Sequence, residues 1–408
     1  MIVANQAVTW LASDEIHLRR LGDGLARFRH EDDPSWMWRA IEANGALEVE
    51  LLLTRNVDKE LIAHVDTLDV EDRERYWSRV GPWVIPDSMR STTARRLLAH
   101  DRPFSAMNLL FRSDEDTFPT ELGIEVLRKP VTGTDERIEV LRNPSYVLRG
   151  MLNQLGAAEA PTEALAVLEW WYNPALRHER TPSAFTKMLA QDPELFGQPV
   201  CLIYDSDSHP SETVEGDSDE QEVASDHEAA VGGGTAITSG ESLTFADTLE
   251  NRNNALDILS QWRRPLPAST DFEPPETRKL KDWVDRAQAA TDQVEGGMSL
   301  IGEALSGLVL GTDGAWPCQA IRELLEHEND PLLESGLLIG RLNGRGATTR
   351  TAYSGGQQER DLEARYKKWA DQVRGAWPRS GALLDSICES YAEDARRVDQ
   401  AADELGDR

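Results

Sequence analysis

The sequence predicts an all-α protein built as a helical-repeat array. Apolar residues recur at the three- and four-residue spacing of amphipathic helices through most of the 408 residues, whereas the alternating runs typical of strands are scarce. Short polar turns, several of them containing proline, separate these stretches. A loose pattern of helix, proline-containing turn and second helix recurs along the chain, and such units must stack to bury their apolar faces.

The expected helices follow from the same signals, taken in chain order. The first covers residues 34–45, with a proline at its first position and Asn44–Gly45 at its end. Further helices are expected over residues 58–68, 70–80, 92–100, 104–111, 161–172, 183–192, 245–264, 277–297, 358–377 and 380–405. The recurring units lie at residues 25–41, 95–110 and 186–203. The twelve tryptophans are expected mainly to pack between these helices.

An acidic insertion interrupts the helical pattern at residues 205–242. It contains eleven acidic residues, no lysine or arginine, and almost no large apolar side chain. Such a segment cannot bury enough surface to offset its ordering entropy, so we predict that it is disordered. It separates an N-terminal helical-repeat region, residues 1–204, from a C-terminal helical region, residues 243–408. These regions form two domains or one continuous array, and the similarity of their helices favours the array.

Composition limits the class of protein. A net charge of −29, from 43 basic and 72 acidic residues, works against non-specific binding to nucleic acids or anionic membranes. No apolar run approaches the length of a membrane-spanning helix, and the first residues lack the features of a signal peptide. The three cysteines are far apart, which fits reduced thiols rather than disulfides. We therefore expect a cytoplasmic protein without membrane association.

Motifs that carry catalysis or bind cofactors are missing from the sequence. It contains neither the glycine-rich phosphate-binding loop that ends in Gly-Lys-Ser/Thr nor the Gly-x-Ser-x-Gly turn of hydrolases. The eight histidines never fall at the spacing of common zinc motifs. We therefore predict no catalytic residue, no metal site and no cofactor, and a non-enzymatic role is favoured over an enzymatic one.

The stretch SGLLIGRLNGRGATTRTAYSGG, residues 335–356, is the best candidate for a binding site. It contains six glycines and three arginines in an otherwise acidic chain, and its glycines permit close approach of a backbone. The candidate binding residues are Arg341, Asn343, Arg345, Arg350 and Tyr353. The alternative is structural: the arginines pair with acidic residues of neighbouring helices, such as Glu359.

Residues 168–207 and 334–397 carry a resemblance to known proteins. They resemble the helical, HEAT- or TPR-like C-terminal regions of large uncharacterised bacterial proteins, some of them associated with defence. The resemblance extends from about residue 15 to the C-terminus. Proteins of this group carry an additional N-terminal effector or nucleotide-binding module, for which we find no signal here. The resemblance therefore implies a sensing or scaffolding part.

Taken together, the sequence favours a non-enzymatic scaffold or sensor module that binds a protein partner within a bacterial defence system. Two alternatives stay open. The first is an enzyme whose active site forms around residues 335–360. The second is an acidic regulator of a nucleic-acid enzyme, an alternative that the strongly negative net charge suggests.

Overall fold

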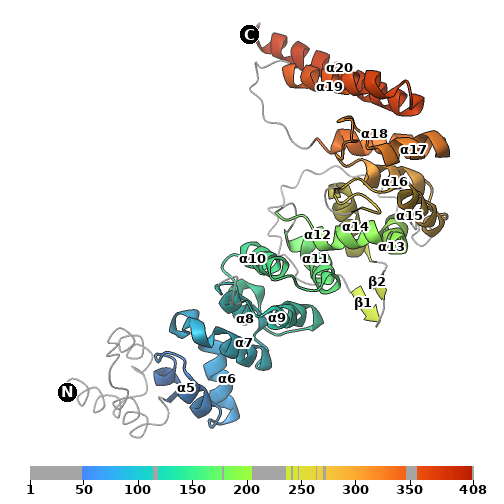
Figure 1. Ribbon diagram of the computed structural model, residues 1–408. Coiled ribbons are helices and arrows are strands. Elements are labelled where there is room, and N and C mark those ends of the chain that lie inside the picture. Colours follow the sequence, from blue (N-terminus) through green and yellow to red (C-terminus); the bar gives the residue numbers. More distant parts are fainter. Residues whose placement is uncertain are drawn as a thin grey trace, which may run out of the picture. The chain divides into compact units, whose positions relative to one another are not determined.

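The computed structural model describes residues 48–113, 118–176, 179–204, 236–239, 242–246, 248–262, 264–269, 273–345 and 356–406. Helices account for well over half of these residues, and the predicted all-α class is confirmed (Figure 1). The chain divides into two compact units, Met1–Ala160 and Pro161–Arg408, here called unit 1 and unit 2. Among the described residues, no helix has both the length and the apolar character needed to cross a membrane.

Unit 1 is a succession of short helices. They are α4 (Glu48–Leu52), α5 (Lys59–Val65), α6 (Val70–Arg79), α7 (Arg90–Ala99), α8 (Pro103–Leu110), α9 (Thr120–Thr132) and α10 (Pro144–Ala157). Three single-turn 3₁₀ helices lie between them, η3 (Pro82–Val84), η4 (Asp87–Met89) and η6 (Ile138–Val140). Side chains define where several helices begin: Asp58 accepts a hydrogen bond from the backbone N–H of Leu61 at 2.7 Å, and Asp69 accepts one from Asp72 at 2.8 Å.

Unit 2 contains the longer helices and one β-hairpin. Its helices are α11 (Thr162–Leu176), α12 (Ser183–Gln191), α13 (Pro193–Tyr204), α14 (Leu249–Gln261), α15 (Thr277–Ala290), α16 (Gly297–Leu305), α17 (Gln319–Glu328), α18 (Pro331–Asn343), α19 (Gln357–Val373) and α20 (Pro378–Gly406). The last two, drawn in red, lie side by side as a long helical hairpin (Figure 1). Throughout unit 2, most helices pack against helices close to them in sequence.

Two of the three recurring units predicted from the sequence form helix–turn–helix pairs. In the first, α7 and α8 pack together, and α8 begins at Pro103. In the second, α12 and α13 pack together, and α13 begins at Pro193. The third unit, at residues 25–41, and the helix expected over residues 34–45 lie outside the described residues.

The predicted regions before and after the acidic insertion are not the two compact units. Helix α13, which precedes the insertion, packs against α14 and α15, which follow it. The contact is close, because a Cβ atom at Gly197 would lie 2.6 Å from the Cβ of Ala290. Burial of these apolar faces joins the two sides of the insertion within unit 2. The boundary between the two compact units lies at Ala160–Pro161 instead. Residues 205–235 and 240–241 of the insertion lie outside the described residues.

A short antiparallel hairpin, which the sequence did not predict, spans the end of the acidic insertion and precedes α14. Strand β1 (Ala236–Ser239) pairs with β2 (Ser242–Phe245), with Ala236 opposite Phe245. The ring of Phe245 lies 4.2 Å from that of Trp170 on α11, centroid to centroid. An aromatic contact therefore holds the end of the hairpin against the helices of unit 2.

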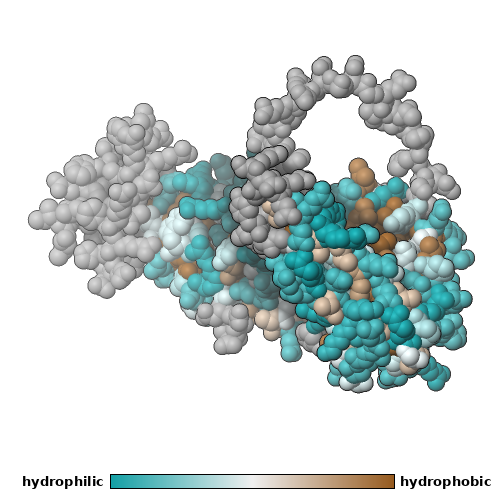
Figure 2. All heavy atoms as spheres, turned by 90° about the horizontal axis from the view of Figure 1, so that it is seen from above, coloured by the Kyte–Doolittle hydropathy of each residue, from teal (hydrophilic) through white to brown (hydrophobic). Residues whose placement is uncertain are grey.

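Most tryptophans among the described residues are core residues, as expected. Trp77 and Trp170 are fully buried in units 1 and 2, whereas Trp83 of unit 1 is 73% exposed. Most of the surface seen in Figure 2 is hydrophilic, and apolar side chains show there as small separate patches. Patches of this size are ordinary for a folded chain and do not by themselves mark a binding surface.

Candidate functional site

The described part of the predicted binding stretch is a packing element of unit 2. Residues 335–343 form most of α18, and two glycines on this helix face α16. A Cβ atom at Gly336 would lie 1.8 Å from the carbonyl oxygen of Ser299, and one at Gly340 would lie 2.5 Å from the hydroxyl of Ser306. These glycines therefore allow two helix backbones to touch, and no ligand is needed to explain them.

Arg341 lies among aromatic rings at the end of α18. Its Nε donates a hydrogen bond to the hydroxyl of Tyr366. The guanidinium carbon lies 5.5 Å from the centroid of the Trp316 ring and 5.8 Å from that of Tyr366, both of which are buried. A cation held over aromatic faces in this way stabilises packing between α18 and α19. The Nε donor and the positive charge of Arg341 are therefore already engaged within the protein.

Arg345 forms the pair that the structural alternative predicts. Its Nη2 donates to Oε1 of Glu359 at 2.7 Å, and its guanidinium carbon lies 5.6 Å from the centroid of the Tyr391 ring. The pair links the second residue after α18 to the first turn of α19. Asn343 is exposed at the end of α18. The other two predicted binding residues, Arg350 and Tyr353, lie outside the described residues.

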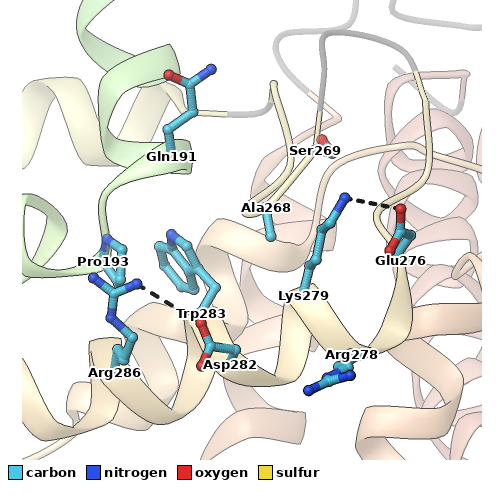
Figure 3. A pocket seen from close by; sticks show the side chains of 10 residues that line it. All are labelled: Gln191, Pro193, Ala268, Ser269, Glu276, Arg278, Lys279, Asp282, Trp283 and Arg286. Atoms are coloured by element: carbon cyan, nitrogen blue, oxygen red, sulfur yellow. Dashed lines mark hydrogen bonds and ion pairs between the residues drawn. The ribbon is translucent and has the colours of Figure 1, made fainter.

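A larger candidate site lies elsewhere in unit 2, and no residue in it was selected from the sequence. It is an open pocket of about 740 Å³. Its lining residues, shown in Figure 3, are Gln191, Pro193, Ala268, Ser269, Glu276, Arg278, Lys279, Asp282, Trp283 and Arg286. We call it the α15 pocket, because six of these residues lie on α15 or directly before it.

The amphipathic character of α15 explains how one helix supplies most of this pocket. Leu280, Val284 and Ala287 are buried against the rest of unit 2. Residues at three- and four-residue spacing, Lys279, Trp283 and Arg286, form a second stripe that lines the pocket. The helical spacing of apolar residues over 277–297 predicted a helix, which ends at Ala290 in the structure, but it gave no signal of a cavity beside it.

The opposite wall consists of the α12–α13 junction and a turn before α15. In this turn Ala268 has a φ of 57°, a left-handed conformation that costs a residue with a Cβ about 1–2 kcal/mol. Its N–H donates to the carbonyl of Ala190 at 2.8 Å, and the Ser269 hydroxyl donates to the carbonyl of Leu266 at 2.7 Å. These bonds fix the turn against α12, so the pocket wall is held in place without a ligand.

Ion pairs form the rim of the α15 pocket. Lys279 Nζ lies 2.9 Å from Glu276, and Arg286 makes a two-pronged contact with Glu194 at 2.6 and 2.9 Å. Arg286 also forms a longer pair with Asp282 at 3.8 Å, and Figure 3 marks this pair and the Lys279–Glu276 pair with dashed lines. The Arg286 hydrogen bonds lower the pKa of Glu194 below its ordinary value. These side chains are largely exposed, and such pairs contribute little to stability. They can therefore exchange partners when a charged ligand approaches.

Trp283 provides the most unusual group in the pocket. Its side chain is only 3% exposed, and its ring packs 5.1 Å from that of Phe196, centroid to centroid. Its indole N–H has no hydrogen-bond acceptor among the described residues. In Figure 3 the indole nitrogen lies on the edge of the ring turned toward Gln191, which lines the same pocket. The nitrogen atom is itself buried, and a buried donor without an acceptor costs about 1–3 kcal/mol.

The lining of the α15 pocket fits binding better than catalysis. Ser269 is the only hydroxyl among its ten lining residues, and no histidine or cysteine is among them. That hydroxyl donates to a backbone carbonyl, so no base is placed to activate it. Across the part of the chain that the structure describes, no group of histidine, cysteine and acidic side chains could hold a metal ion.

Comparison with protein-family models found no match, and comparisons with curated proteins and with solved structures found none either. The fold and the α15 pocket are therefore interpreted from this chain alone.

Proposed function

We propose that the protein is a non-enzymatic interaction module, a scaffold or sensor, that binds a segment of a partner protein in the α15 pocket. The observation that carries the proposal is the pocket itself, a cavity of about 740 Å³ whose lining combines the apolar side chains of Pro193 and Trp283 with a charged rim. The pocket leaves room for a ligand to enter and leave along its open side, as an extended chain segment requires.

Two features support a protein partner over a small substrate. The pocket opens widely to solvent, whereas sites for small molecules bury most of the ligand. Its rim carries three cations and two acids, which is a polar border around the apolar surface of Pro193 and Trp283. An apolar centre with a charged border is the usual anatomy of a protein interface.

The enzyme alternative at residues 335–360 has less support. Arg341 and Arg345, the two arginines of that stretch within the described residues, are held by Tyr366 and by Glu359. They act as structural contacts between helices, and a catalytic cation would instead need to meet a substrate. A cytoplasmic location and a role in bacterial defence remain part of the proposal, and they rest on the composition and on the resemblance of residues 168–207 and 334–397.

A peptide library displayed on phage tests the proposal. The purified full chain selects peptides, and each selected peptide is then bound to the wild type, to Lys279→Glu and to Lys368→Glu. Lys279 lines the pocket, whereas Lys368 is an exposed lysine of α19 away from it. We expect peptides whose binding is lost in Lys279→Glu and kept in Lys368→Glu. Failure to select any peptide, or equal binding to both variants, would contradict the proposal.

A further inference from the structure

We draw no further inference here: the strongest candidate, the groove of about 430 Å³ between α7 and α9 in unit 1, carries nothing, because its three cations lie beside Glu125 and Asp101 and nothing in the described part of the chain shows what would occupy it.

Discussion

The guanidinium of Arg345 donates a 2.7 Å hydrogen bond to Glu359, whose side chain is only 2% exposed. This contact joins the second residue after α18 to the first turn of α19. A carboxylate so deeply buried is tolerated only while a cation compensates it. The pair is therefore a structural link between two helices that are separated in sequence by residues 344–356.

Replacement of Arg345 by alanine should destabilise unit 2 by about 3 kcal/mol, because it leaves a buried carboxylate without its cation. Urea unfolding followed by circular dichroism measures the loss. The matched control is Arg365→Ala, which removes an exposed arginine of α19 that has no ion pair among the described residues, and should change stability by less than about 0.5 kcal/mol. Equal effects of the two changes would mean that Arg345 does not link the helices.

Substitution of Gly336 by alanine should separate α16 from α18. The added Cβ would lie 1.8 Å from the carbonyl oxygen of Ser299, and a backbone atom cannot rotate away as a side chain would. We expect a loss of about 3 kcal/mol or more in the free energy of unfolding. Gly375, where an added Cβ meets nothing within 4 Å, provides the control, and Gly375→Ala should be neutral or slightly stabilising.

Acid should weaken the pair between Asp313 and Arg322. Arg322 is 1% exposed and donates to both carboxylate oxygens of Asp313, at 2.7 and 2.9 Å. These hydrogen bonds lower the pKa of Asp313 below its ordinary value of 3.8. The pair's contribution is therefore fully present above about pH 4 and is lost as the pH falls through the lower pKa of the folded state.

The variant Asp313→Asn should be less stable than the wild type at neutral pH, and the difference should shrink as the pH falls below about 4. Denaturant titrations over this range measure both chains. A difference that stays constant with pH would show that Asp313 does not titrate as part of this pair.

The thiols of the folded chain should react slowly. Burial, and to a smaller extent the nearby Asp385, raises the pKa of Cys388 to about 11. Burial also raises the pKa of Cys318. At a pKa near 11, only about one thiol in a thousand is ionised at pH 8, and the thiolate is the reactive form. With Ellman's reagent we expect Cys201, which is half-buried, to react first, and all three to react in denaturant. If the Cys201→Ser variant still reacts rapidly with the reagent through its two remaining thiols, this order is contradicted.

Local signals in the sequence predicted most of the fold. Helical spacing and capping residues such as Asp58 depend on neighbours in the chain, so the helices around them could be assigned without a structure. The Arg345–Glu359 pair was foreseen as one of two alternatives, since both residues flank the same glycine-rich stretch. The hairpin at Ala236–Phe245 was missed because its strands are only four residues long.

The α15 pocket could not be predicted by the same means. It joins Gln191, Ala268 and Trp283, and only tertiary packing brings these residues together. In sequence, Trp283 has the spacing of an ordinary core residue, and its burial confirms that reading. What separates it from other core tryptophans of unit 2 is its position in a pocket wall. This property has no local signature.

The packing of helices against their neighbours in sequence has a consequence for how the protein folds. Contacts of this kind close short loops and cost little entropy, so folding can begin independently at several helix pairs. A chain still being synthesised can thus complete α11 and α12 before the last helices are made. The α15 pocket is different, because it needs α13 and α15 from both sides of the acidic insertion. Peptide binding would therefore report that the whole centre of unit 2 has finished folding.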